Sequence, residues 1–309
     1  MIPLKDGFLT GSYPPLVTPF KDGAVDYETY AGLVERQVAE GSHGIVVNGT
    51  TAEPSTLSVE ERNRLVETAV KAAAGRIPVV AATGGQSHVD TIAMTAAAEK
   101  AGVDALLVVT PYFVRPPQRG LVEYYLDIGR RTGLPLMIYH IPGRAAVNMT
   151  VDSIAAIAER LPTLVGMKHA MNDLTLVTEV LARLGPEFRV FVGLEDLSFP
   201  MMALGAQGVM NAVGNLMPKV VALLCEHVLA GRLAEARAAH FALFELNQAV
   251  FFDTNPIPMK YMMKRLGLLP NEEHRLPMVP ATAELAKRLD QVLERVGALG
   301  AATPRRKTA

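Results

Sequence analysis

Lys168 stands near the end of an apolar run, TLVGMKHAM, that otherwise has the composition of a buried strand. Lysine is almost never fully buried unless its charge is compensated. An amine in an apolar site loses its proton more easily than one in water, and a neutral amine can attack a ketone to form a Schiff base. We therefore consider Lys168 a candidate nucleophile. The alternative is a structural lysine that reaches solvent or pairs with Glu195.

Tyr139 lies near the end of the preceding apolar run, LPLMIYH. If the two runs are neighbouring strands, their ends bring Tyr139 and Lys168 within hydrogen-bonding range. The phenol could then move protons to and from the reacting carbon. The alternative for Tyr139 is an interior tyrosine whose hydroxyl makes a structural hydrogen bond.

The loop NGTTAEPSTLSVEER follows the second apolar run and carries Thr50 and Thr51. Small hydroxyls and free backbone N–H groups next to a helix start suit a carboxylate ligand. An ordinary strand-to-helix turn capped by Ser58 would have the same composition. Arg144, in the later stretch IPGRAAVN, could bind a second carboxylate bidentately, unless it is a solvated surface arginine. Tyr112 and Asn211 follow other apolar runs and are further candidates for substrate binding.

Two histidines offer a rival chemistry. His140 and His169 directly follow Tyr139 and Lys168, and with Glu195 or Asp196 they could hold the metal of a metal-dependent aldolase. Each histidine, however, follows a residue that is better placed to face inward. We therefore predict no metal. The glycine-rich stretch LGAQGVMNAVGN leaves a flavin or phosphosugar site as another alternative.

Eight apolar runs, near residues 16, 44, 77, 105, 134, 163, 189 and 208, alternate with helical patterns. Strands that are apolar on both faces belong in parallel sheets covered by helices, so the pattern predicts a (β/α)8 TIM barrel. Its active site lies at the C-terminal ends of the strands. The clearest helix is SVEERNRLVETAVKAAAG, with Ser58 as N-cap, Glu61 completing a capping box and Gly75 as the stop. The alternative, a doubly wound open sheet, lacks its Gly-x-Gly-x-x-Gly loop.

The predicted organisation has three parts: a barrel that carries the active site (1–230), a C-terminal helical region (231–297) and a loose tail (298–309). Beyond the last strand we expect helices around 218–230, 233–251, 256–266 and 281–297.

Composition restricts the partners. The net charge is −1, and the 30 lysines and arginines are scattered, so neither nucleic acid nor an anionic lipid surface is expected. No uninterrupted apolar stretch is long enough to span a membrane, and no secretion signal is recognisable. The single cysteine, Cys225, favours a reducing compartment, and we expect a cytoplasmic protein with a small-molecule partner.

The chain resembles the dihydrodipicolinate synthase / N-acetylneuraminate lyase family of Schiff-base aldolases. The resemblance covers nearly the whole chain and rests on GTTAEPSTLS, VTPYFVRPPQ, YHIPGR, GMKHA and NPIPMKYMMKRLGL. It implies a barrel with a C-terminal helical region, a homotetramer built as a dimer of dimers, and no metal or organic cofactor. It also implies that Lys168 forms the Schiff base with pyruvate, that Tyr139 relays protons, and that Thr50 and Thr51 bind the pyruvate carboxylate and assist the relay.

Departures from the family pattern bear on the second substrate. The family's lysine-pathway synthases have Tyr-Tyr where this chain has Tyr112 and Phe113, and their second tyrosine completes the relay across a subunit interface. Arg144 is retained, which indicates an acceptor with a distal carboxylate. His140 and His169 replace the family's usual asparagine and glutamate.

These departures order the functional hypotheses. The first is an aldolase that joins or cleaves pyruvate and a carboxylate-bearing semialdehyde, of the 2,4-dihydroxyhept-2-ene-1,7-dioate aldolase type. The alternative is a 4-hydroxy-tetrahydrodipicolinate synthase that uses aspartate semialdehyde. An alternative from a different class is a non-catalytic keto-acid sensor.

Overall fold

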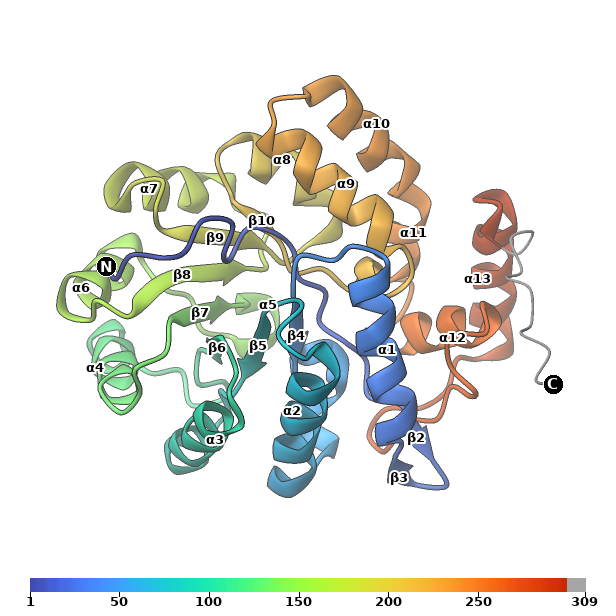
Figure 1. Cartoon of the computed structure of the whole chain (residues 1–309), viewed down its shortest axis with the longest axis horizontal. Coiled ribbons are helices and arrows are strands. Elements are labelled where there is room, and N and C mark those ends of the chain that lie inside the picture. Colours follow the sequence, from blue (N-terminus) through green and yellow to red (C-terminus); the bar gives the residue numbers. More distant parts are fainter. Residues whose placement is uncertain (299–309) are drawn as a thin grey trace.

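An eight-stranded parallel sheet, rolled into a barrel, forms the centre of the protein, and the computed structural model describes residues 1–298 (Figure 1). Around the ring the strands follow the order β1-β10-β9-β8-β7-β6-β5-β4. They are β1 (Gly11–Ser12), β4 (Ile45–Val47), β5 (Val79–Ala82), β6 (Ala105–Val109), β7 (Leu136–His140), β8 (Leu164–His169), β9 (Arg189–Val192) and β10 (Gly208–Val209). The predicted (β/α)8 fold is confirmed.

The barrel closes between the N-terminal segment and β4. The Leu16 N–H donates to the carbonyl of Val46, and the Val46 N–H donates to the carbonyl of Pro14, both at 3.0 Å. The prediction of a first strand around LVTPF was wrong in position, because β1 lies earlier, at Gly11–Ser12. Pro14 and Pro15 have no N–H to donate, so the regular ladder is interrupted before residue 16 is reached.

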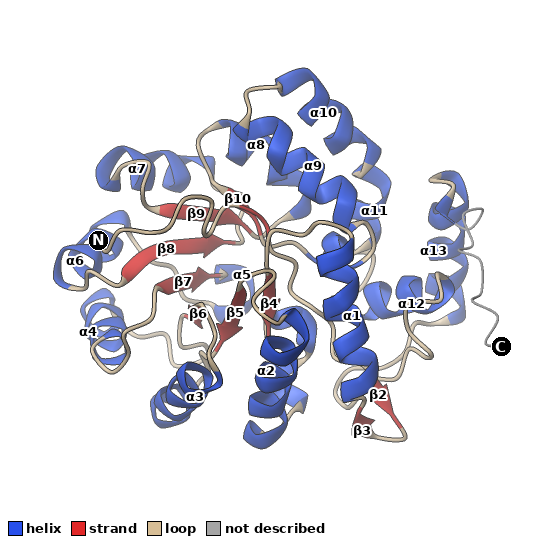
Figure 2. Ribbon diagram, viewed as in Figure 1, coloured by secondary structure: helices blue, strands red, loops and turns tan. Residues whose placement is uncertain are grey.

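Helices surround the strands, and a short antiparallel hairpin follows the closing segment (Figure 2). The barrel helices are α1 (Tyr27–Ala39), α2 (Val59–Ala73), α3 (His88–Ala101), α4 (Gln118–Gly129), α5 (Pro142–Ala145), α6 (Val151–Arg160), α7 (Leu174–Leu184), α8 (Ser198–Ala203) and α9 (Pro218–Leu229). The hairpin consists of β2 (Phe20–Lys21) and β3 (Ala24–Val25).

The C-terminal helices lie at one side of the barrel (Figure 1). They are α10 (Leu233–Ala242), α11 (Phe244–Ala249), α12 (Ile257–Arg265) and α13 (Ala283–Arg295). The helix predicted over 233–251 is therefore two helices that meet at Leu243. The division at residue 230 stays a prediction, and residues 299–309 of the expected tail lie outside the described residues. In the described part of the chain, no helix combines the length and the hydropathy needed to cross a membrane.

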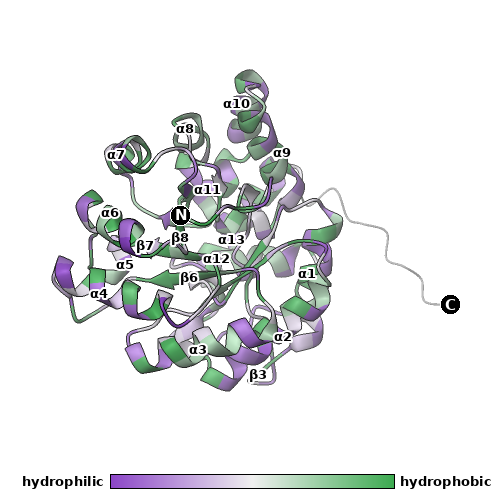
Figure 3. Ribbon diagram, turned by 60° about the vertical axis from the view of Figure 1, so that its left-hand side comes forward, coloured by the Kyte–Doolittle hydropathy of each residue, from purple (hydrophilic) through white to green (hydrophobic). Residues whose placement is uncertain are grey.

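The barrel interior is packed with side chains and is not a pore. Along the strands the colouring is predominantly hydrophobic, whereas the surrounding helices carry alternating polar and apolar stripes (Figure 3). One buried cluster collects the inward-facing residues Leu9, Tyr13, Val46, Val80, Ala82, Ala105, Leu107, Met137, Tyr139, Val165, Ala170, Phe191 and Met210. This filled interior restricts polar chemistry to the strand ends.

The start of α2 confirms the predicted capping box. The Ser58 hydroxyl accepts from the Glu61 N–H at 3.2 Å, and the Glu61 carboxylate accepts from the Ser58 N–H at 3.0 Å. At the other end, Ala74 and Gly75 both adopt positive φ angles, of 49° and 71°. These caps fix α2 directly after the loop that carries Thr50 and Thr51.

Replacing Ser58 with alanine removes the acceptor for the Glu61 N–H. We expect the free energy of unfolding to fall by about 1 kcal/mol, the usual effect of losing an N-cap. Urea unfolding followed by circular dichroism measures this difference. Glu67→Ala, at an exposed position within α2, is the control and should change stability less. Equal stability of Ser58→Ala and the parent protein would contradict the capping role.

Candidate active site

Lys168 and Tyr139 occupy paired positions on the adjacent strands β8 and β7. Both are buried, with 3% and 5% of their surface exposed, and the Lys168 Nζ lies 4.3 Å from the centre of the Tyr139 ring. The structure therefore brings together Lys168 and Tyr139, as predicted from their positions near the ends of neighbouring strands. In the described residues Lys168 forms no ion pair with Glu195. The alternative of a structural lysine that pairs with Glu195 is therefore not supported.

Gly193, just beyond β9, makes room for the lysine side chain. A Cβ atom at this position would lie 2.9 Å from Lys168 Cε and 2.7 Å from the Cβ of Ala170. Any larger residue would displace the amine from the face of Tyr139. Sequence reasoning missed this role, because a glycine after a strand more often marks a turn.

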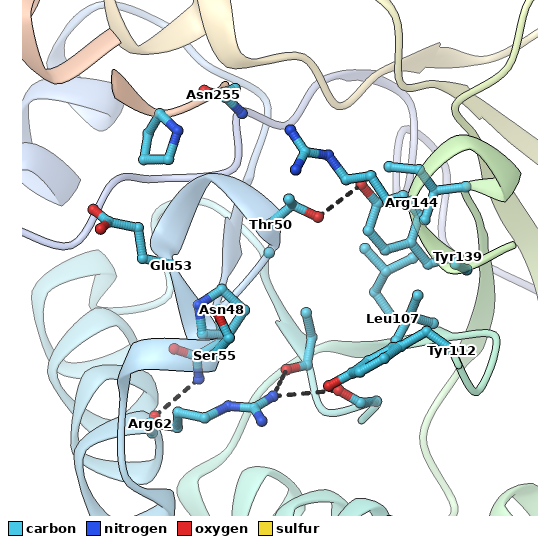
Figure 4. A pocket seen from close by; sticks show the side chains of 18 of the residues that line it. Asn48, Thr50, Glu53, Ser55, Arg62, Leu107, Tyr112, Tyr139, Arg144 and Asn255 are labelled. Carbon is cyan, nitrogen blue, oxygen red and sulfur yellow. Dashed lines mark hydrogen bonds between the residues drawn. The ribbon is translucent and has the colours of Figure 1, made fainter. Parts of the chain in front are cut away.

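Each residue of the Thr50–Ala52 turn makes a hydrogen bond to a residue outside the turn. The hydroxyls of Thr50 and Tyr139 are 3.1 Å apart (Figure 4). The carbonyl of Ala52 accepts a hydrogen bond from the Thr18 hydroxyl at 2.8 Å. Thr51 accepts from the Asn255 side-chain amide at 2.9 Å. Asn255 belongs to the NPIPMKYMMKRLGL motif that carries the family resemblance, but its contact crosses 204 positions of sequence and could not be read from the motif.

Glu53, the next residue, is clamped by the C-terminal region. Its carboxylate oxygens lie 2.6 Å from Lys260 Nζ and 3.0 Å from His274 Nδ1. Glu53 and Lys260 are 3% and 1% exposed. Burial lowers the pKa of Lys260, whereas the nearby Glu53 charge opposes this shift. Segments from both ends of the chain therefore fix the loop that carries the two threonines.

Lys260→Met should leave the buried Glu53 carboxylate with His274 but without its lysine partner, and breaking a buried pair of this kind costs about 3 kcal/mol. We expect the double variant Glu53→Gln/Lys260→Met to recover part of this loss, because no charge is then left uncompensated. Urea unfolding of the single and double variants measures both effects. Lys264→Met, on the same helix but in a partly exposed ion pair, should have less effect. A double variant that is no more stable than Lys260→Met would contradict the charge argument.

A cavity of about 280 Å³ opens beside these residues, at the small end of ligand pockets. Its lining includes Thr50, Tyr139 and Arg144 at one end and Tyr112 and Arg62 at the other (Figure 4). Arg144 is exposed, and within residues 1–298 its guanidinium makes no hydrogen bond or ion pair. The site can therefore offer a free cation to a small anionic ligand.

Other predicted site residues lie outside the lining. Thr51 is 3% exposed, and Asn211, also 3% exposed, donates to the Ser198 hydroxyl at 3.1 Å. Lys168 lies against the Tyr139 ring and likewise does not line the cavity. Asn211 thus has a structural partner, and nothing brings it to the cavity with Thr50 and Arg144.

Glu195 is a buried carboxyl in the short helical turn Glu195–Leu197, just beyond β9. It is 1% exposed and accepts a 2.6 Å hydrogen bond from the Ala212 N–H. Burial raises the pKa of Glu195 to about 7, and the positive charge of Lys168 acts in the opposite direction. Glu195 therefore lies close enough to Lys168 for the two charges to interact.

His140 and His169 contact each other. Their Nδ1 atoms are 3.0 Å apart, and their rings stack with centroids 5.2 Å apart. Among residues 1–298, no group of three or more His, Cys, Asp or Glu side chains is arranged to hold a metal ion. The metal-dependent alternative therefore lacks a donor set in the described structure.

A buried lysine beside a tyrosine, at the strand ends of a (β/α)8 barrel, is the arrangement expected of a Schiff-base aldolase. The model of the dihydrodipicolinate synthetase family matches residues 8–296, and the chain belongs to this family. It is a lyase of the class I pyruvate-aldolase type.

Known relatives cover almost the whole chain. A 4-hydroxy-tetrahydrodipicolinate synthase from Thermus thermophilus is 45% identical over 290 residues, covering 94% of this chain and 97% of the relative. The crystal structure of dihydrodipicolinate synthase from Aquifex aeolicus is 39% identical, with a TM-score of 0.92, and the match covers 94% and 98% of the two chains. The Thermotoga maritima enzyme, at 36% identity and a TM-score of 0.91, covers 94% and 99%.

Proposed function

We propose that this enzyme condenses pyruvate with aspartate semialdehyde, the 4-hydroxy-tetrahydrodipicolinate synthase reaction. The observation that carries the proposal is the 45% identity, across nearly the full length of both chains, to a relative of that name. This reverses the order of the sequence hypotheses, in which Phe113 placed the heptenedioate aldolase first. The comparisons favour the hypothesis that stood second.

In the proposed mechanism the neutral amine of Lys168 attacks the ketone carbon of pyruvate. Loss of water gives a protonated imine, and loss of a methyl proton then gives an enamine. The enamine carbon attacks the aldehyde of the second substrate and forms the new carbon–carbon bond. The amino group of aspartate semialdehyde can then displace Lys168 from the imine, which closes a ring and frees the enzyme.

The hydroxyls near Lys168 are suited to the proton transfers. Tyr139 lies against the lysine and within 3.1 Å of the Thr50 hydroxyl, so a proton can pass between the reacting atoms and the cavity. Thr50 and Thr51, at the start of a short helical turn, are proposed to bind the pyruvate carboxylate. Asn255 holds the Thr51 hydroxyl in place.

Phe113 supports keeping a second candidate, the heptenedioate-type aldolase. Its side chain is 82% exposed and does not line the cavity, whereas Tyr112 does line it. We propose that Tyr112 supplies the relay hydroxyl that is missing at position 113. If Tyr112 does not supply this hydroxyl, the heptenedioate-type aldolase becomes the better candidate, because its reaction needs fewer proton transfers than ring closure does.

The exposed apolar residues near the cavity support an oligomer. Phe113, Val114 and Leu276 are 82%, 58% and 82% exposed, and contiguous exposed apolar surface marks protein–protein interaction sites. We propose the homotetramer, a dimer of dimers, that the family resemblance implies. A cytoplasmic location is proposed from the single cysteine, Cys225, which is free and buried.

Rates with the two semialdehydes, measured side by side at saturating pyruvate, test the substrate. We expect kcat/KM for aspartate semialdehyde to exceed that for succinic semialdehyde by at least a hundredfold, about 2.7 kcal/mol of transition-state binding. A preference for succinic semialdehyde would contradict the proposal and favour the heptenedioate aldolase. The absence of turnover with either aldehyde would favour the non-catalytic sensor.

Arg144→Ala should weaken the use of the semialdehyde, because a charge-assisted contact to its carboxylate is lost. We expect kcat/KM for the aldehyde to fall by roughly tenfold to a hundredfold, about 1.4–2.7 kcal/mol. Trapping of pyruvate by borohydride should be unchanged. Arg130→Ala, an arginine at the end of α4 that does not line the cavity, is the control. Loss of pyruvate trapping in Arg144→Ala would show that Arg144 does not act on the acceptor.

A further inference from the structure

The histidines next to Tyr139 and Lys168 lie on the opposite side of the sheet from these residues. The β7–β8 register pairs Tyr139 with Lys168 and, one residue further, His140 with His169. Because successive side chains of a strand point to opposite faces, the histidine pair points away from the reacting amine. Both histidines are fully buried, and the proposed mechanism does not use them.

Hydrogen bonds extend from this pair to a segment outside the sheet. His140 Nε2 lies 2.7 Å from the Asn148 side-chain oxygen and 3.2 Å from the Met149 N–H. These residues follow α5, the short helix that carries Arg144. The contacts therefore form one line from β8, through His169 and His140, to the Arg144 segment.

The short distance between the two Nδ1 atoms limits the number of protons that can lie between the rings. With Nδ1 atoms 3.0 Å apart, one ring must donate and the other accept, so a single proton lies between them. This holds whether His140 Nε2 donates to Asn148 or accepts from the Met149 N–H. Two neutral rings satisfy the contact, and an additional proton places a charge in a buried site.

The strands do not need the histidines to stay in register. The backbone ladder already joins β7 to β8, and the Ala170 N–H donates to the His140 carbonyl at 2.9 Å. The segment after α5 has no place in this ladder. The interaction that the histidines add is thus a hydrogen bond of His140 Nε2 with Asn148 or with Met149, which connects this segment to β8.

We propose that the buried His140–His169 pair is a positioning element that ties the Arg144 segment to the strand of Lys168, so that acceptor binding weakens when the pair takes up a proton. This inference rests on the proposed function, in which Arg144 binds the acceptor carboxylate. It concerns positioning, because neither histidine touches the reacting atoms.

The charges around the pair define its pH range. Asp173, which precedes α7, acts on both rings and favours their protonation, while the segment after α5 contributes the uncharged Asn148. Lys168 and Tyr139 belong to the same two strands but face the barrel interior. Burial outweighs Asp173 and lowers the pKa of both histidines, that of His140 to about 4. The unfolded chain takes up these protons near pH 6.5, so folded-state stability is lost as the pH falls from 6.5 toward 4.

Two variants of His169 test the connection. His169→Phe keeps a ring for stacking but cannot hydrogen bond, whereas His169→Gln keeps a polar group that does not titrate. His88→Asn, at a half-exposed histidine on α3, is the matched control. For each protein, kcat and KM for the semialdehyde are measured from pH 4.5 to 8, together with pyruvate trapping and urea unfolding.

We expect His169→Phe to raise KM for the semialdehyde at least threefold at pH 8, with kcat and pyruvate trapping nearly unchanged. In the parent protein and in His88→Asn, KM should rise below about pH 5, and this rise should be reduced in His169→Gln. An unchanged KM in His169→Phe, or an identical acid-side rise in His169→Gln, would overturn the proposal.

Urea unfolding separates this inference from the proposed function. The unfolding midpoint should fall between pH 6.5 and 4.5 in the parent protein and fall less in His169→Gln, whatever the substrate is. If the unfolding midpoint fell equally in the parent protein and in His169→Gln, the two histidines would not form a buried neutral pair, and the inference would be wrong. If the parent protein uses neither semialdehyde but the unfolding midpoints differ as expected, the substrate proposal is what has failed.

Discussion

The burial of one amine against one phenol is the constraint around which the site is built. Lys168 has almost no exposed surface and lies on the face of Tyr139, without an ion pair in the described residues. The reaction needs this amine in its uncharged form, which is the form that attacks a ketone. The parallel register of β7 and β8 sets this contact, and Gly193 leaves the space that the lysine chain needs.

The C-terminal helices take part in the site as well as covering the barrel. Asn255 holds Thr51, and Lys260 holds Glu53, so two residues of the threonine loop depend on contacts made more than 200 positions later in the chain. Glu53 itself adopts a left-handed conformation, with φ of 56°, that few residues favour. The ion pair with Lys260 therefore stabilises a backbone shape that local sequence alone would not maintain.

Much of this could be predicted from sequence because the signals are local. Apolar runs gave seven of the eight strands their approximate positions, and Ser58 with Glu61 marked the start of α2. The first strand was misplaced because apolar composition does not reveal the missing N–H groups of Pro14 and Pro15. Asn255, Lys260 and His274 were missed as partners of the threonine loop because tertiary contacts leave no periodic pattern. Asn211 was included because it follows a strand, but it binds Ser198.

The most direct measurement is mass spectrometry of the protein after reduction with borohydride in the presence of pyruvate. We expect one added three-carbon unit, on the peptide that contains GMKHAM, and none in Lys168→Arg, whose guanidinium stays charged and cannot condense. The variant should retain the circular dichroism spectrum of the parent protein. An adduct on Lys260 or another lysine, or no adduct on the parent protein, would contradict the assignment of Lys168 as the covalent catalyst.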